Sequence, residues 1–260
     1  MNLNDFLSTN SKSIPPSAIR RFFDLANEMR GQVISLSIGE PDFVTPIDIR
    51  EAGIRSLEQG NTHYSPNQGF IELREAISDY MKRRFQLRYD ASHEILVTVG
   101  GSEAIDLFVR AVVNPGDEVI IPEPCFVSYK SCVLLAGGIP VTIPCRQEDD
   151  FKLRPEQLQA ALTPRTKLVF LGFPNNPTGA VLEKNEVEAL AEVLRNQPVL
   201  VLADELYAEL TYEPASHCSI AAVPGMRDRT VIINGFSKAF AMTGWRIGFA
   251  CGPQELIGAK

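Results

Sequence analysis

The feature that most restricts the fold of this sequence is a series of short apolar segments separated by amphipathic stretches. The segments are EILVTV (94–99), DEVIIP (117–122), IPVTIP (139–144), KLVFLGFP (167–174), VLVLAD (199–204), TVIING (230–235) and IGFACG (247–252). Several are rich in valine and isoleucine and apolar throughout, which is typical of strands covered on both faces. Helical spacing lies between some of them, as in EAIDLFVRAVV (103–113) and EVEALAEVLR (186–195). The alternation predicts an α/β fold with a mainly parallel sheet sandwiched by helices.

The first 45 residues have a different texture from the remainder of the chain. IPPSAIRRFFDLANEM predicts a short amphipathic helix led by two prolines, and VISLSIGEPDF predicts a strand that turns at Gly39 and Pro41. From residue 46 onward, DIREAGIRSLEQG and IELREAISDYMKRRF show the spacing of amphipathic helices. We therefore expect residues 1–45 to form an arm and part of a small domain, and residues 46–260 to form one large domain.

Charge and composition restrict the possible partners. The formal net charge of −7 argues against nucleic acid and anionic membranes, and the basic triplet at 82–84 has the spacing of a solvated helix face. No segment approaches the roughly 18 apolar residues of a membrane span, and MNLNDFLSTN lacks the features of a signal peptide, so we expect a cytoplasmic protein. Five cysteines without a CxxC pair and three scattered histidines predict neither a disulfide framework nor a metal site, and His217-Cys218 is expected in a loop.

Two strand ends carry glycine and asparagine turns. In parallel sheets, ligands collect at the carboxyl ends of the strands. Gly100-Gly101-Ser102-Glu103 opens a helix whose unpaired amides suit a phosphate, although a glycine turn with Ser102 as the helix cap explains it equally well. PNNPTG (174–179) is explained either as a rigid turn or as a device that fixes an amide at the strand end.

Charged side chains follow two further strands. Asp204 comes directly after VLVLA, where a carboxylate is costly to bury unless it meets a cation or donors, and Tyr207 follows it. Lys238 lies in GFSKAFAMTGWRIG (235–248) among small and apolar residues, although lysine is rarely buried unpaired. Together these strand ends offer a phosphate cradle, an amide, a carboxylate with a phenol, and a lysine. This set suits a phosphorylated aromatic aldehyde that condenses with amines. Pyridoxal phosphate meets that description.

The stretch GFSKAFAMTGWRIG resembles the pattern around the Schiff-base lysine of the class I/II pyridoxal-phosphate aminotransferases of fold type I, the aspartate aminotransferase superfamily. SIGEPDF, HYSPNQGFIELREAI, VTVGGSEAID, IPEPCFVSY, GFPNNPTG and LADELY occur in that family's order and approximate spacing. The resemblance implies the large domain of that fold. It also implies that most of the small domain, with the arginine that clamps the substrate carboxylate, is missing from this chain, because family members continue beyond residue 260.

The resemblance further implies a role for each matching residue. Lys238 would form the internal aldimine with pyridoxal 5'-phosphate and move the proton at the substrate α-carbon, and Asp204 would pair with the pyridinium nitrogen. The other implied cofactor contacts are Tyr207 and Asn176 on the phenolic oxygen, Phe126 on the ring face, and Gly101, Ser102, Ser237 and Arg246 on the phosphate.

The substrate would meet Gly39, Phe126 and Asn176. Tyr64 matches a tyrosine that reaches the phosphate of the neighbouring subunit, which implies a homodimer with shared active sites. One position departs from the pattern, because Gly235 stands where many members have a serine that binds phosphate.

The expected function is transfer of an amino group from an L-amino acid to a 2-oxo acid by a ping-pong mechanism. Three alternatives remain open: a C–S β-lyase or cyclopropane-forming synthase (as in ACC synthases) on the same fold, a regulator that senses the cofactor for a DNA-binding partner, and a non-catalytic cofactor-binding fragment. No residue indicates which amino acid and oxo acid are used.

Overall fold

The computed structural model describes residues 1–14, 22, 24–26, 28–29, 32–34 and 39–259. Within this part of the chain, a seven-stranded sheet has the order β1-β7-β6-β5-β4-β2-β3. Its strands are β1 (Ile95–Thr98), β2 (Glu118–Glu123), β3 (Ile139–Pro144), β4 (Thr166–Gly172), β5 (Leu200–Asp204), β6 (Thr230–Gly235) and β7 (Gly248–Cys251). β7 alone among them runs opposite in direction to the other six strands, so the predicted mainly parallel sheet is confirmed.

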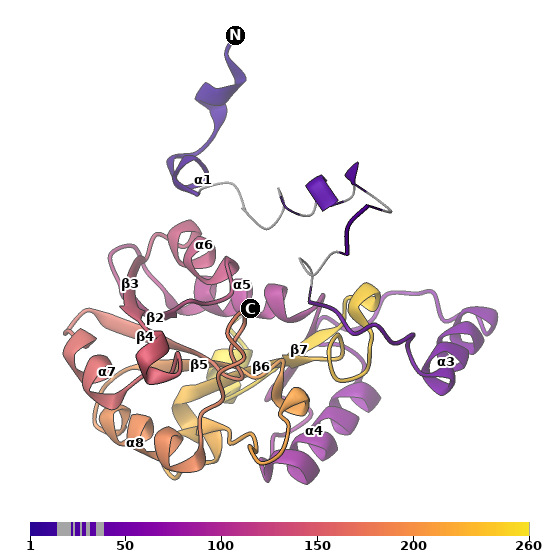
Figure 1. Ribbon diagram of the computed structural model, residues 1–260. Helices are drawn as coiled ribbons and strands as arrows, with labels where there is room; N and C mark the ends of the chain where they lie inside the picture. The colour runs from indigo at the N-terminus through magenta and orange to yellow at the C-terminus, as the bar shows by residue number, and fades with distance from the viewer. Residues whose placement is uncertain (15–21, 23, 27, 30–31, 35–38, 260) are drawn as a thin grey trace.

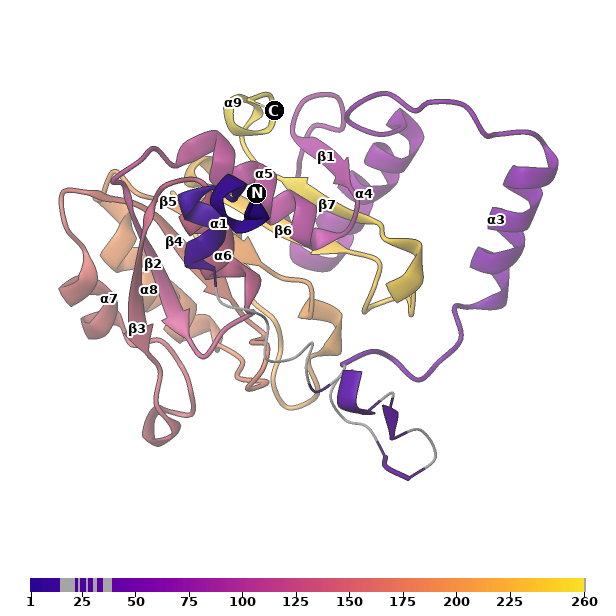
Figure 2. The same ribbon diagram turned by 90° about the horizontal axis from the view of Figure 1, so that it is seen from above.

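Helices cover both faces of the sheet (Figures 1 and 2). The α-helices described are α1 (Thr9–Ser13), α3 (Ile47–Glu58), α4 (Ile71–Phe85), α5 (Gly101–Val112), α6 (Ser128–Leu135), α7 (Pro155–Ala161), α8 (Lys184–Arg195) and α9 (Gln254–Ile257). The 3-10 helices are η1 (Leu3–Phe6), η2 (Gln147–Asp149), η3 (Ala208–Leu210), η4 (Ile220–Ala222), η5 (Arg227–Arg229) and η6 (Thr243–Trp245). None of these helices is both long and apolar enough to cross a membrane.

The hydrophobic core consists of two layers, one on each face of the sheet. Alternate residues of the central strands contribute to opposite layers, as Val201 and Leu202 of β5 do. One layer packs against α4, α7 and α8, and the other against α5, α6 and α9. The apolar runs read from the sequence are therefore mostly buried on both sides; exceptions are Val99 at the end of the first run, 61% exposed, and Ile139 of the edge strand β3, 41% exposed.

The helical periodicity also corresponds to helices. α4 has the predicted bounds, α5 begins two residues before the predicted stretch, and α8 likewise begins two residues early. Lys82, Arg83 and Arg84 are exposed on α4, which confirms the solvated face expected for the basic triplet.

Part of the segment before residue 39, chiefly residues 15–21 and 35–38, lies outside the described residues. The helix predicted from IPPSAIRRFFDLANEM and the strand predicted from VISLSIGEPDF both include such residues, so they stay predictions, as does the division at residue 45. In the described part, α1 lies beside α6, and neither η1 nor α1 contributes a buried residue.

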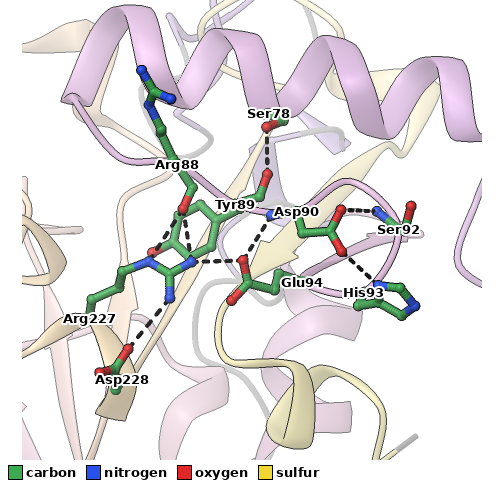
Figure 3. Close-up of polar contacts among 9 residues, drawn as sticks. All are labelled: Ser78, Arg88, Tyr89, Asp90, Ser92, His93, Glu94, Arg227 and Asp228. Atoms are coloured by element: carbon green, nitrogen blue, oxygen red, sulfur yellow. Dashed lines mark hydrogen bonds and ion pairs between the residues drawn. The ribbon is translucent and has the colours of Figure 1, made fainter.

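A polar cluster fixes the connection between α4 and β1 (Figure 3). Arg227 of η5 donates through Nη2 to the carbonyl of Arg88 at 2.8 Å and to Glu94 at 2.7 Å. Its guanidinium lies over the Tyr89 ring, 4.8 Å from the centre, and Ser78 of α4 donates to the Tyr89 carbonyl. Charge-assisted hydrogen bonds are the stronger kind, so the cluster holds the beginning of β1 against the end of the preceding helix.

Candidate active site

A cavity of about 330 Å³ lies at the carboxyl ends of the parallel strands. It receives residues that follow β1, β2, β4, β5 and β6, segments that are far apart in the sequence. Its lining includes Gly39, Gly101, Ser102, Phe126, Asn176, Asp204, Tyr207, Ser237, Lys238 and Arg246. The structure therefore brings together every site residue expected from the sequence with the exception of Tyr64.

Asp204 ends β5 inside this cavity, and both of its carboxylate oxygens accept a hydrogen bond. The Tyr129 hydroxyl donates to Oδ2 at 2.6 Å, and the backbone N–H of Leu206 donates to Oδ1 at 3.2 Å. Burial raises the pKa of Asp204 above its ordinary value, the two donors lower it, and the charge of Glu205 raises it further. A cationic group of a ligand would relieve this cost, so Asp204 is suited to bind a protonated nitrogen.

Lys238 reaches the same cavity from the turn after β6. Its Nζ donates to the carbonyl of Gly39 and lies 5.6 Å from the centre of the Tyr207 ring. Burial lowers the pKa of Lys238, Glu40 raises it and Arg246 lowers it, with a net shift downward. A lysine with a lowered pKa has more of the neutral amine, which is the nucleophilic and basic form.

The first turn of α5 forms one end of the cavity. Gly100 precedes the helix with a φ of 77°, and a Cβ atom there would lie 2.5 Å from the guanidinium of Arg246. A Cβ on Gly248 would lie 2.5 Å from the Gly100–Gly101 backbone, so glycine permits this close approach. Free helix amides, the positive helix end and a guanidinium favour a phosphate.

Ser102 is not the cap of α5, which corrects the alternative explanation of its turn. The residue that precedes the helix is Gly100, which makes no side-chain cap, and Ser102 lies inside the first turn and lines the cavity. Glu103 instead accepts a hydrogen bond from the backbone N–H of Val99. The turn is thus held by Glu103 and not by Ser102, which leaves the Ser102 hydroxyl available to a ligand.

Of the two asparagines of PNNPTG, one forms the rigid turn and the other supplies the fixed amide. Asn175 forms the turn, because its Oδ1 accepts from the backbone N–H of Thr178 at 3.2 Å and from its hydroxyl at 2.8 Å. Asn176 lines the cavity and hydrogen-bonds the side chain of Tyr207, which lowers the pKa of that phenol against the larger effects of burial and Asp204. The turn and the fixed amide are thus both present.

Gly235, where the resemblance leads us to look for a serine, leaves little room for a side chain. A Cβ atom would lie 3.1 Å from the Gly248 Cα and from the Ile247 carbonyl, both of them backbone atoms. Ser237, two residues on, is buried and lines the cavity. Its hydroxyl is therefore the serine donor available at this end of β6.

Tyr129 is the residue of this site that sequence reasoning missed. It lies on α6 and contacts Phe126 edge to face at 5.7 Å between ring centres, and its hydroxyl donates a hydrogen bond to Asp204. Burial and the Asp204 charge raise the pKa of Tyr129, so it remains a neutral donor. The stretch PCFVSY contains both rings, one helical turn apart, but nothing in the sequence indicates that the second one points beneath the first.

Tyr64 lies apart from the cavity of its own chain. It belongs to the segment between α3 and α4, and its side chain is fully exposed. Its expected contact with a neighbouring subunit stays a prediction.

The chemistry of these groups fits pyridoxal phosphate. The glycine-lined end with Ser102, Ser237 and Arg246 suits a dianion, and the doubly hydrogen-bonded Asp204 suits a ring nitrogen that carries a proton. Lys238 supplies the amine for an aldehyde. The cavity volume lies within the usual range for small ligands.

The sequence and the structure both match known proteins. The profile of the family Aminotransferase class I and II matches residues 31–259. The chain is 54% identical over 254 residues to YugH of Bacillus subtilis, assigned as an aminotransferase, with 98% of this chain and 65% of that protein covered. It is 43% identical over 251 residues to aromatic-amino-acid aminotransferase 2 of Thermococcus litoralis, with 96% and 64% covered.

A solved structure of aspartate aminotransferase from Thermus thermophilus with maleate superposes with a TM-score of 0.93 at 43% identity. The superposition covers 97% of this chain and 66% of that one. The chain thus spans 65% and 64% of the length of the two curated relatives.

Proposed function

The chain belongs to the class I and II aminotransferases, and from that premise we propose that it is the cofactor-binding part of a pyridoxal-phosphate-dependent aminotransferase. The proposed reaction moves an amino group from an L-amino acid to a 2-oxo acid by a ping-pong mechanism. The observation that carries the proposal is the meeting of Lys238, with its lowered pKa, and Asp204, with its two donors, in one cavity beside an anion-binding helix end.

Each residue has a task that follows from its position. When bound, pyridoxal phosphate supplies an aldehyde that condenses with amines and a protonated ring that withdraws electrons. Asp204 holds the proton on the ring nitrogen, and Tyr129 and the Leu206 amide favour the ionised carboxylate and orient it. Lys238 Nζ accepts the proton from the substrate α-carbon and later returns it, because its lowered pKa leaves part of it as neutral amine.

The remaining residues bind and orient. Gly101, Ser102, Ser237 and Arg246 hold the phosphate, and Phe126 covers one face of the ring. Tyr207 and Asn176, which already hydrogen-bond each other, hold the phenolic oxygen, and the substrate carboxylate passes the backbone of Gly39.

We infer that the active protein is a homodimer in which Tyr64 contacts the cofactor phosphate bound in the partner subunit. The exposure of Tyr64 on a segment away from its own cavity supports this assignment.

Covalent trapping tests the proposal. The purified protein is incubated with pyridoxal phosphate, reduced with borohydride, digested and mapped by mass spectrometry. The label should appear on Lys238, be lost in Lys238→Ala, and persist in the matched variant Lys184→Ala, whose lysine is 79% exposed at the beginning of α8. A label spread over surface lysines would contradict the proposal.

The reaction is tested separately with an amino acid and a 2-oxo acid. A new amino acid is expected, whereas release of ammonia and pyruvate would identify a β-lyase instead. Lys238→Ala should abolish transfer and keep part of the cofactor affinity, because the phosphate contacts do not involve the lysine.

A further inference from the structure

The segment from Asp204 to Leu210 carries acidic side chains on both of its sides. Asp204 and Tyr207 line the cavity, whereas Glu205 and Glu209 contact other elements. Glu205 is 2% exposed although it is the direct neighbour of Asp204, and a second buried carboxylate at this place is unfavourable for the first.

Glu205 is paired with residues of the irregular segment before η4. The Ser219 hydroxyl donates to its Oε1 at 2.5 Å, and His217 Nε2 lies 3.1 Å from its Oε2. The side chains of His217 and Glu205 are 8% and 3% exposed, so water does not screen the pair. Phe85 of α4 packs edge-on against the His217 ring at 5.5 Å between ring centres and holds it in place.

Glu209 has partners of its own on α4. Arg84 donates to both of its carboxylate oxygens at 2.8 and 2.6 Å, and the Tyr80 hydroxyl donates to it at 2.8 Å. The charged groups near His217 are therefore Glu205 and the already neutralised Glu209. The titratable groups near Asp204 are Glu205 and the neutral phenols of Tyr129 and Tyr207.

We propose that Glu205 and His217 form a positioning pair for Asp204, in which His217 offsets the Glu205 charge and the pair anchors the segment that carries Asp204 and Tyr207. The backbone supports this placement, since the N–H of Glu205 also donates to the Ile233 carbonyl of β6 at 2.9 Å. The contact of His217 Nε2 with Glu205 Oε2 at 3.1 Å offsets the Glu205 charge behind Asp204, so Asp204 keeps its own negative charge for the ring nitrogen. This inference rests on the proposed function.

The test uses two ligands that differ at one atom. The probes are pyridoxal phosphate and its analogue with carbon in place of the ring nitrogen, and the quantity measured is the ratio of their affinities for the apoprotein. Both probes carry the phosphate and the aldehyde, so the ratio reports the contact with Asp204. His217→Gln, which removes the imidazole beside Glu205, should lower the ratio about tenfold, the change that one pKa unit represents.

The double variant Glu205→Gln with His217→Gln distinguishes charge from packing. It lacks both members of the pair and carries no carboxylate at position 205, so the proposal expects the ratio to return to within about twofold of the wild-type value. Ser219→Ala, which removes a neutral donor and no charge, should lower stability and leave the ratio within about twofold. If His217→Gln does not fold, Glu205→Gln alone should keep the preference for the nitrogen ligand down to a lower pH than the wild type does.

The outcomes separate this inference from the proposed function. A wild-type ratio near one would overturn the contact of Asp204 with the ring nitrogen, and both proposals with it. A high wild-type ratio that His217→Gln leaves unchanged, or a double variant as poor as the single one, would refute the positioning pair alone. An unchanged pH range for Glu205→Gln would do the same.

Discussion

The hydrogen bond from Tyr129 to Asp204 makes a prediction about pH that follows from the geometry. Tyr129→Phe removes one hydroxyl and keeps the ring that packs on Phe170 at 4.6 Å between ring centres. The lost donor lies 2.6 Å from a buried carboxylate. A hydrogen bond to a charged group contributes about 1.5–3 kcal/mol, against about 0.5–1.5 kcal/mol for a neutral pair.

The sign of the pH effect is set by Asp204. Its pKa is raised in the folded protein, so its protonated form favours the fold, and this contribution is lost as the pH rises through the folded pKa. Tyr129 counteracts that loss by stabilising the carboxylate. Tyr129→Phe should therefore destabilise the apoprotein by about 1.5–3 kcal/mol at about pH 8 and by less at about pH 5, because protonation of Asp204 removes the charge that the hydroxyl stabilises.

Urea unfolding of the apoprotein at the two pH values measures this difference. The matched control is Tyr89→Phe, because the Tyr89 hydroxyl is buried without a hydrogen-bond partner among the described residues. Its removal should change the free energy of unfolding by less than about 0.5 kcal/mol at either pH. An equal loss at both pH values in Tyr129→Phe would refute the view that Tyr129 stabilises the ionised form.

Two further predictions concern stability and are measured by the same unfolding assay. Gly235→Ala should lower the free energy of unfolding by about 1–3 kcal/mol, because the new Cβ meets backbone atoms at 3.1 Å. Its control, Gly244→Ala, has no atom within 4 Å of the new Cβ and should lower it by less than about 0.5 kcal/mol. Similar losses in the two variants would contradict the close approach at Gly235. Arg227→Met should cost about 1.5–3 kcal/mol through the lost bonds to Glu94 and the Arg88 carbonyl, and Arg55→Met, which breaks an exposed pair, at most about 0.5 kcal/mol. A loss for Arg227→Met no larger than that control would show that the cluster is not needed to hold β1.

The strands were predictable because each is an apolar run with burial on both faces. β3 and β6 have the bounds expected from IPVTIP and TVIING, and the other strands differ by one or two residues at their ends. Position in the sheet was not predictable in the same way. Nothing in IGFACG indicates that β7 runs opposite to both of its neighbours.

The site was predictable where a residue follows a strand directly. Asp204 and Lys238 were found by that placement, and the resemblance to a family assigned their tasks. The contacts of Tyr129 and Glu205 were not predictable, because they depend on side-chain direction across the sheet and on an irregular segment without periodicity. The Glu205–His217 pair joins a strand end to a residue in a loop, and no spacing rule connects such positions.

The place of β7 in the sheet has a consequence for how the protein is made. β7 is the last strand of the described chain, and it lies between β1, the first, and β6. During synthesis on the ribosome, β1 has no sheet partner until β7 has been made, because the two strands are more than a hundred residues apart in the sequence. Pairing over such a separation is slow, and the apolar strands stay open to other chains in the meantime. The end of the cavity formed by Gly100, Gly101 and Arg246 is thus assembled after Asp204 and Asn176 have been synthesised, and only once β7 is in place.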